Sequence, residues 1–217
     1  MNNNAPNPSE AKASPLRAKS QAALELRLVL ASSSPRRKEL LSQIGFVPNV
    51  IDPPDIDETP YKKEKPADFA ARMGQEKANI IAKKYDDSII VAADTIVAIG
   101  TRIIGKANNR DEAFRDLSLM SGRAHRVYTG LSVIKKVGKV EQKADRLVCT
   151  KVQFKRMSDA EINWYLDQNE WQGKSGSFTL MGIGAGFISA INGSHTNVIG
   201  LPLCEVRNIL IGMGFRS

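Results

Sequence analysis

The apolar run SIIVAADTIVAI, at residues 88–99, constrains the fold of this chain more than any other segment. It is rich in β-branched residues and does not alternate with polar ones, a pattern typical of a strand buried on both faces. Strands of this kind belong to sheets that helices cover on both sides. The run therefore predicts an α/β fold in which residues 88–99 form a buried strand.

Further strand signals lie on both sides of this run. The segments 26–32 and 46–51 predict short strands, and the second leads into an acidic loop. We expect three strands within 125–157, of which the first two are joined near Gly138. A hairpin-like pair is predicted within 186–200, with Asn192-Gly193 at its turn. The strand-rich middle predicts an elongated mixed sheet rather than a wholly parallel one.

Helix signals alternate with these strands, which indicates the α/β class with helices flanking the sheet. N-cap residues, helix-starting prolines and closing glycines mark the expected helix ends. The predicted helices begin at Pro35, at Asp68, at Asn109, after the capping box of Ser158 and Glu161, and at Pro202.

Composition limits the class of protein further. The 217 residues suffice for one substantial domain or two small lobes, and no apolar run approaches the roughly 18 residues of a membrane span. Residues 1–26 are polar and contain three prolines, so we expect a disordered tail before a single domain at 27–217. Cys149 and Cys204 are predicted to be buried free thiols, which fits a reducing, cytoplasmic location. The net charge of +8 points to an anionic partner: nucleic acid, a phospholipid surface or a phosphate-rich small molecule.

Two arginines stand where a helix disfavours them. Ser34 is the predicted N-cap and Pro35 the first helical residue, which leaves Arg36 and Arg37 in a first turn that already carries partial positive charge. An anion bound there would meet free backbone N–H groups, two guanidinium groups and the hydroxyl of Ser32. The segment therefore predicts a phosphate site. The alternative is that both arginines point to water.

Asp94 lies within the apolar run, and a carboxylate there must be paired, bound to a metal or working as a base. The alternative is a structural Asp that caps a turn. The acidic loop at 52–59 offers oxygen ligands that could hold Mg²⁺ or Mn²⁺ against a phosphate chain. Lys77 and Lys106 could join the arginines in neutralising a triphosphate, although either lysine is equally consistent with a solvated surface charge.

Two short motifs and the histidines are excluded as sites. GKS at 173–175 lacks the preceding glycine of a P-loop, and GIGAG at 182–186 lacks the third glycine and the following helix of a dinucleotide site. We expect these glycines to allow a close backbone approach beside a ligand or at a tight turn. His125 and His195 are too few and too scattered for a zinc site.

Seven segments follow one another between about residue 28 and 212: LASSSPRRKELL, DIDET, EKA, ADTIV, GKA, MSGRAHRVYTG and INGSHTNVIGLPL. In order and spacing they resemble the Maf family of nucleoside triphosphate pyrophosphatases. The resemblance implies two lobes around a nucleotide cleft, an architecture shared broadly with the inosine triphosphate pyrophosphatases. It also implies a cytoplasmic homodimer that uses a divalent cation, Mg²⁺ or Mn²⁺, and clears nucleotides by hydrolysing the triphosphate to the monophosphate and pyrophosphate.

The resemblance assigns roles to single residues. Asp94 falls on the family's proton acceptor, and Glu58 joins Asp94 at the metal site. The remaining positions fall on residues that bind the substrate phosphates: Ser32, Arg36, Arg37, Lys77 and Lys106.

Three positions bear on the nucleobase. Arg36 matches the family branch that acts on dTTP and UTP, since the branch that acts on 7-methyl-GTP has Trp there. Thr95 falls on a second specificity position. Met181 falls on a third, where the two branches have Gln and Glu, and methionine cannot replace the hydrogen bonds of an amide. His195 stands where the family usually has Tyr.

The resemblance favours dTTP, UTP or modified pyrimidine nucleotides as substrates. Two alternatives stay open: a pyrophosphatase for 7-methyl-GTP or another modified purine, and a non-catalytic nucleic-acid-binding or regulatory protein. The acidic Asp94 makes nucleic acid the less favoured partner, because a buried acid repels a phosphate backbone.

Overall fold

The computed structural model describes residues 26–216, and the predicted N-terminal tail lies outside these residues except for Leu26. A seven-stranded sheet forms the centre of the molecule, with the strand order β2-β1-β3-β5-β6-β7 and with β4 paired to β3. The strands are β1 (Arg27–Leu30), β2 (Val50–Ile51), β3 (Ser88–Ile99), β4 (Arg102–Ile104), β5 (Ala124–Val137), β6 (Val140–Phe154) and β7 (Ile188–Asn192).

The sheet is mixed, as predicted. Strand β1 pairs in parallel with β2 and β3, whereas β4, β5, β6 and β7 join by antiparallel pairing. Strand β3 is the buried apolar run, and ten of its twelve residues lie in the interior. The prediction of an α/β protein with a mixed sheet is therefore confirmed.

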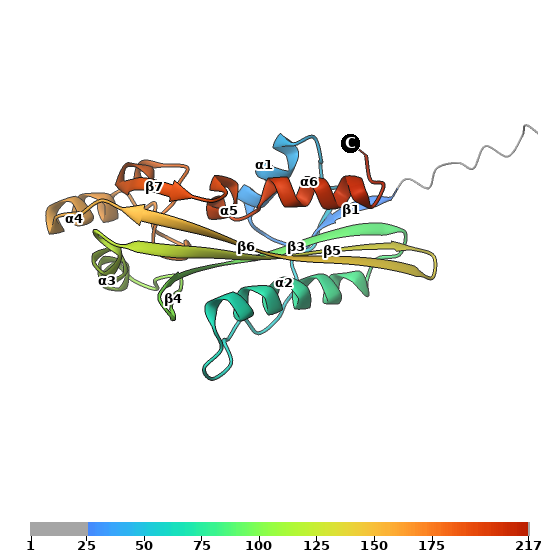
Figure 1. The fold of residues 1–217 in the computed structure, drawn as a ribbon, viewed down its shortest axis with the longest axis horizontal. Helices are drawn as coiled ribbons and strands as arrows, with labels where there is room; N and C mark the ends of the chain where they lie inside the picture. The colour runs from blue at the N-terminus through green and yellow to red at the C-terminus, as the bar shows by residue number, and fades with distance from the viewer. Residues whose placement is uncertain (1–25, 217) are drawn as a thin grey trace, which may run out of the picture.

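Helices cover both faces of the sheet (Figure 1). On one face lie α1 (Pro35–Gln43), α5 (His195–Ile199) and α6 (Leu203–Gly212), and on the other lies α2 (Pro66–Ala82). At the far end of the elongated sheet are α3 (Arg110–Met120), α4 (Asp159–Asp167) and the short 3-10 helix η1 (Ile183–Phe187). Among residues 26–216, no helix combines the length and apolar character that crossing a membrane requires.

Two main hydrophobic cores lie at the two ends of the sheet. One joins the start of β3 to β1, α1 and α6, with Leu30, Leu41, Val91 and Leu210 fully buried within it. The other joins the end of β3 to α3, α4 and η1, and is lined by aromatic rings such as those of Phe154, Tyr165 and Phe187. The burial of these apolar side chains at each end of the sheet makes the largest favourable contribution to the free energy of folding.

Helix α2 lies unusually close to the sheet because two glycines face each other. A Cβ atom added to Gly130 of β5 would lie 1.9 Å from the carbonyl oxygen of Ala70, and one added to Gly74 would lie 2.4 Å from the carbonyl oxygen of Gly130. Any side chain at either position would push the helix away. Since Asp94 of β3 pairs with Gly130, this contact sets the distance between α2 and Asp94.

Strand β3 has an open edge in its middle. On the side away from β5, it pairs with β1 up to Val91 and with β4 from Val97 onward. Within the described part of the chain, no strand pairs with residues 92–96 on that side. The chain leaves β1 at this gap and turns into α1, so residues 31–34 border the opening.

Several predicted elements differ from the structure. Residues 125–157 form two long strands rather than three, because β5 and β6 pair continuously from Val137↔Val140 to Ala124↔Gln153. The expected hairpin around Asn192-Gly193 is a strand followed by a helix, since Ser194 accepts a hydrogen bond from the Asn197 N–H and caps α5.

Other expectations differ in detail. Helix α2 begins at Pro66 rather than Asp68. Both cysteines are exposed, which corrects the prediction of buried thiols. Cys149 lies on the exposed side of β6 and Cys204 on the solvent side of α6, whereas the adjacent Thr150 and Leu203 are buried.

Candidate active site

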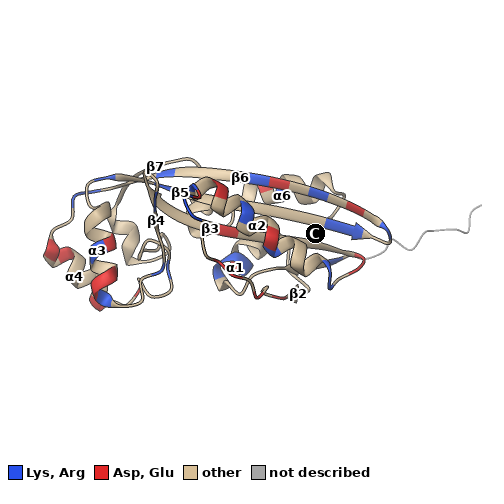
Figure 2. Cartoon of the chain, turned by 90° about the horizontal axis from the view of Figure 1, so that it is seen from below, with Lys and Arg blue, Asp and Glu red and all other residues tan. Residues whose placement is uncertain are grey.

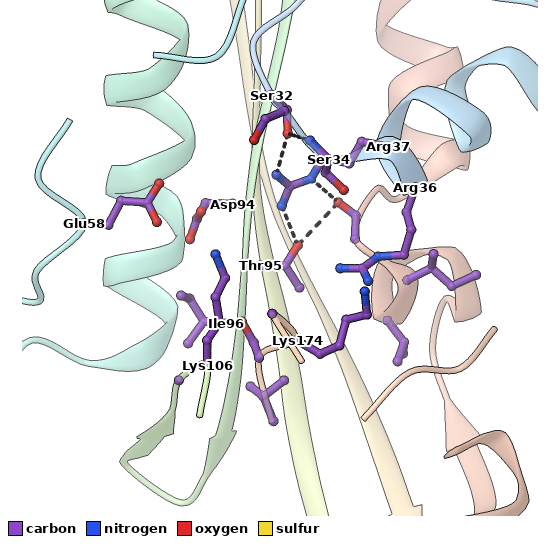
Figure 3. A pocket seen from close by; sticks show the side chains of 18 of the residues that line it. Ser32, Ser34, Arg36, Arg37, Glu58, Asp94, Thr95, Ile96, Lys106 and Lys174 are labelled. Atoms are coloured by element: carbon purple, nitrogen blue, oxygen red, sulfur yellow. Dashed lines mark hydrogen bonds between the residues drawn. The ribbon is translucent and has the colours of Figure 1, made fainter. Parts of the chain in front are cut away.

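A cleft of about 690 Å³ lies at the open edge of β3. Neighbouring residues of a strand point to opposite faces of the sheet, yet at an open edge both can reach the same opening. Asp94 and Thr95 do so, and the cleft extends around the edge of the strand from the α2 face to the α1 face (Figure 3). Its walls come from residues 31–37, 94–97, 103–106, 173–175, 178–180 and 198–200, from Pro53, Pro54, Glu58 and Pro60 in and beside the acidic loop, and from Phe69 and Lys77 of α2.

Two carboxylates and one lysine form the end of the cleft on the α2 face. The Lys77 ammonium lies 2.5 Å from Asp94 Oδ1 and 2.6 Å from Glu58 Oε1. The side chains of Lys77 and Asp94 are 8% and 11% exposed, whereas that of Glu58 is half exposed, so only Glu58 can move freely. Asp94 is therefore a paired carboxylate in the middle of a strand, and the alternative of a turn-capping Asp is wrong.

The charge of Glu58 depends on its basic neighbours. Partial burial acts to raise the pKa of Glu58, but the hydrogen bond from Lys77 and the charges of Lys77, Lys106 and Arg37 outweigh this and hold the pKa below its usual range. Glu58 therefore stays ionised at neutral pH, as a metal ligand must be.

Arg37 connects three parts of the chain across the middle of the cleft. Its guanidinium group donates to the Gly200 carbonyl at 2.8 Å, to Ser32 Oγ at 3.0 Å and to Thr95 Oγ1 at 3.1 Å. Burial lowers the pKa of Arg37, an effect that the nearby Asp94 charge opposes. Three of its five N–H groups are thus committed to internal oxygens, and Arg37 holds the walls of the cleft together.

Arg36 takes a different direction, although it is the next residue. It points across the cleft on the α1 face toward Lys174, as Figure 3 shows. Its Nε atom is buried and has no hydrogen-bond partner among the described residues. The sequence pattern of two adjacent arginines therefore contains one structural residue and one residue that is free to bind a ligand.

The other predicted residues divide into two groups. Ser32 is buried and lines the cleft, and its Oγ accepts from Arg37 and from the Ser34 backbone N–H at 3.2 Å. Thr95 and Lys106 also line the cleft. Met181 is 55% exposed and does not belong to the cleft walls, and His195 is exposed at the start of α5.

Lys174 is the functional candidate that sequence reasoning missed. It lies in the GKS segment, which was excluded as a P-loop, and in the structure it lines the cleft opposite Arg36. The sequence holds one signal that points to Lys174, namely the glycines on either side of it. Gly173 and Gly176 both adopt the left-handed backbone conformation that marks a tight turn.

Only two of the residues that line this cleft are carboxylates, Glu58 and Asp94. No group of three or more His, Cys, Asp or Glu side chains within residues 26–216 could hold a metal ion unaided. Both carboxylates converge on one point, which Lys77 Nζ occupies. Such a pair suits a Mg²⁺-type ion, which takes one or two carboxylates and completes its shell with phosphate oxygens and water.

The fold and the cleft together define an α/β protein whose cleft places basic side chains beside a pair of carboxylates. A comparison with family models matches residues 27–213 to the family described as Maf-like protein. The chain belongs to the Maf family.

Curated relatives agree with this assignment. A dTTP/UTP pyrophosphatase of Caulobacter vibrioides is 47% identical over 87% of this chain and 96% of its own length. A protein named nucleoside triphosphate pyrophosphatase from Rickettsia akari is 46% identical over 88% of this chain and 96% of its own length. Among solved structures, a HAM1 protein from Coxiella burnetii covers 61% of this chain and 74% of its own at 16% identity, with a TM-score of 0.37 that is too low for a comparison of folds.

Proposed function

We propose that this protein hydrolyses nucleoside triphosphates to the monophosphate and pyrophosphate, and that dTTP and UTP are its preferred substrates. The observation that carries the proposal is the buried Asp94 carboxylate, held in place by Lys77 at the edge of a cleft whose other walls carry Arg36, Lys106 and Lys174. Relatives named dTTP/UTP pyrophosphatase, alignable over most of this chain, support the choice of base.

The chemistry is the attack of a water molecule on the α-phosphorus. Lys77 binds Asp94 Oδ1, which orients the carboxylate and leaves Oδ2 to accept a proton from the water. As the new P–O bond forms, the bond between the α-phosphorus and the bridging oxygen breaks, and its electron pair leaves with pyrophosphate. Lysine and arginine side chains stabilise the charge that develops on this leaving group.

Glu58 and Asp94 are the residues that would hold a divalent cation, Mg²⁺ or Mn²⁺. When bound, such a cation neutralises charge on the phosphate oxygens. Half-exposed Glu58 would have the freedom to adjust to such a cation, while buried Lys77 would keep its hydrogen bond to Asp94 Oδ1.

The charge distribution argues against a nucleic-acid-binding protein. Basic and acidic residues are interspersed along β6 and α2 on the face shown in Figure 2, rather than gathered in one basic stripe. Nucleic-acid-binding surfaces concentrate Lys and Arg on one face, so the net charge of +8 gives this alternative little support.

A pyrophosphate-release assay tests the proposal. The panel holds dTTP, UTP, the other standard nucleotides and 7-methyl-GTP, each with Mg²⁺ and with Mn²⁺. We expect release from dTTP and UTP, and a loss of about 100-fold or more in kcat for Asp94→Asn, with nucleotide binding retained. Asp167→Asn, which makes the same change on the surface of α4, is the matched control.

The other outcomes have separate meanings. Release mainly from 7-methyl-GTP would move the protein to the purine branch. Activity that survives in Asp94→Asn would remove the proposed base. No release from any nucleotide, together with salt-dependent DNA binding, would favour the nucleic-acid-binding alternative.

The resemblance further implies a cytoplasmic homodimer, and we propose both properties as part of this function. Light scattering coupled to size-exclusion chromatography tests the dimer, and fractionation of cells tests the location.

A further inference from the structure

Lys174 and Arg36 lie on the α1 side of the cleft and point toward one another (Figure 3). Burial is the main cause that lowers the pKa of Lys174, and the nearby charge of Arg36 is the second. Neither side chain takes part in the ion pairs formed within residues 26–216. The Arg36 Nε atom is buried and has no hydrogen-bond partner in the same part of the chain. The protein therefore leaves charged donors at this end of the cleft that a ligand can use.

The opposite end of the cleft carries the groups that suit a triphosphate. Asp94 and Glu58 converge there as the candidate metal ligands, and Lys77 lies between them. Lys106 belongs to the same end, because its charge helps to hold the pKa of Glu58 below the usual range. A divalent cation with two lysines can neutralise a phosphate chain. We therefore place the phosphates on the α2 side, with the α-phosphorus beside Asp94.

The remainder of the nucleotide has to continue along the open edge of β3. Asp94 accepts a hydrogen bond from Lys77 of α2, whereas Thr95 accepts one from Arg37 of α1, so the two strand residues face opposite sides of the edge. A nucleotide whose phosphates fill the α2 side extends past Thr95 to the α1 side. Its base then lies beside the charged donors of Arg36 and Lys174.

The α1 end of the cleft combines apolar walls with these donors. Val198 and Ile199 of α5 line the cleft, as does Leu180 from the loop that carries Lys174. Apolar walls with a few polar groups are typical of sites that hold a small molecule. The two carboxylates among the lining residues both lie at the other end, so this end offers charged donors and no charged acceptor.

Donors without a charged acceptor distinguish one pyrimidine from another. Uracil and thymine carry a carbonyl oxygen at position 4, which accepts a hydrogen bond, whereas cytosine carries an amino group there, which donates. A lysine ammonium group has three donors and no acceptor, so it binds the carbonyl oxygen and is mismatched with the amino group. The positive charges of Lys174 and Arg36 would also repel the cationic ring of 7-methylguanine.

The loop that carries Lys174 is fixed to neighbouring elements. Ser175 forms an isolated antiparallel bridge with Lys106, and Ser177 donates to Asp116 of α3 at 3.0 Å. A pre-ordered loop binds a ligand at a smaller entropy cost than a mobile one. Met181, at the end of the same loop, is 55% exposed and lies outside the cleft walls. Lys174 is therefore the side chain of this loop that can donate a hydrogen bond to a base.

We propose that Lys174 determines base specificity by donating a hydrogen bond to the 4-carbonyl oxygen of uracil or thymine, beside Arg36. The inference rests on the proposed function and deepens it, since it names a residue that selects dTTP and UTP over cytosine nucleotides. It assigns the hydrogen bond to the base that Met181 cannot make to a different position of the same loop.

Isothermal titration calorimetry with UMP and CMP tests the inference without turnover. The two ligands share the sugar and the phosphate and differ in the groups at positions 3 and 4 of the base. Their Kd values, and that of pyrophosphate with Mg²⁺, are measured for the wild-type protein and for Lys174→Met, which removes the N–H donors. We expect the wild-type protein to prefer UMP and Lys174→Met to bind UMP about tenfold more weakly, because a charge-assisted hydrogen bond is lost. The affinities for CMP and pyrophosphate should change by about twofold or less.

Three further variants serve as controls. Lys139→Met makes the same change in the exposed turn between β5 and β6 and should leave every Kd unchanged. Lys174→Arg keeps the charge and the donors, and should retain most of the preference for UMP. Lys106→Met is the reciprocal variant, which should weaken pyrophosphate binding and keep the ratio of the UMP and CMP affinities. Thermal unfolding checks that each variant is folded.

Three results would overturn the inference. They are equal affinity of the wild-type protein for UMP and CMP, an equal loss of both affinities in Lys174→Met, and a loss of pyrophosphate affinity in Lys174→Met. If the preference for UMP depends on Lys174 but no triphosphate is hydrolysed, the inference stands and the proposed function fails. If UTP is hydrolysed and Lys174→Met keeps the full preference for UMP, the proposed function stands and the inference fails.

Discussion

Arg36 and Arg37 are adjacent in sequence but have different tasks. Arg37 donates three hydrogen bonds to buried oxygens, whereas the Arg36 Nε atom has no partner among the described residues. We expect Arg37→Ala to lower the free energy of unfolding by about 2–4 kcal/mol, because the Gly200 carbonyl loses its strongest donor inside the protein. Arg36→Ala should change it by about 0.5 kcal/mol or less and weaken nucleotide binding instead. Urea denaturation and calorimetry separate the two effects, and equal losses of stability would contradict this division.

His125 makes the stability of the protein depend on pH. Both ring nitrogens are buried without partners among the described residues, and the ring lies edge-on to Phe154 and Phe178. Burial lowers the pKa of His125 from 6.5 to about 4. The unfolded chain therefore binds a proton between pH 6.5 and 4 that the folded protein does not, so stability falls as the pH falls through this range, by up to about 3 kcal/mol.

Urea denaturation at pH 7 and pH 4.5 measures this dependence. His125→Leu keeps a similar volume without a titratable group, and we expect a flatter stability profile over this interval. The matched control His195→Leu changes the exposed histidine of α5 and should keep the slope of the wild-type protein. An unchanged slope in His125→Leu would show that other groups cause the acid sensitivity.

At the scale of elements, the contact between α2 and β5 brings Lys77 to Asp94. Gly130→Ala would place a methyl group 1.9 Å from the Ala70 carbonyl oxygen, so the helix must move outward. We expect a loss of stability of about 3 kcal/mol and a drop in kcat, because overpacking shifts the lysine that orients the catalytic carboxylate. Gly212→Ala in α6 is the control, since a Cβ there meets nothing within 4 Å. A fully active Gly130→Ala would mean that Lys77 is not needed in this position.

Local signals predicted most elements, and long-range pairing decided the others. The capping box of Ser158 and Glu161, the N-cap Asn109 and the apolar run of β3 act within a few residues, and all three are confirmed. The split of residues 125–157 into three strands was wrong, because the polar residues on the outer face of β6 resemble a break in a strand. Only the pairing with β5 over its full length shows that the strand continues.

At the scale of the whole molecule, the sequence could name the residues of the site but not their arrangement. The motifs placed Ser32, Arg36, Asp94 and Lys106 as candidates, and all of them line the cleft. They could not show that Arg37 is occupied by internal oxygens or that Met181 lies outside the walls. They also could not predict that Lys174 lines the cleft, because its position depends on a loop that packs on Gly105 and Lys106, far away in sequence.

The open edge of β3 has a mechanical consequence. Strands β1 and β2 support only the start of β3, and β4 and β7 are paired only toward the other end, so the sheet is three strands wide beside residues 92–96. A sheet bends most easily where its cross-section is smallest, and here that section joins two separately packed cores. Any flexing of β3, β5 and β6 about this waist would change the width of the cleft directly. Helix α2 packs against the waist through Gly74 and Gly130, so it limits such bending on one face of the sheet.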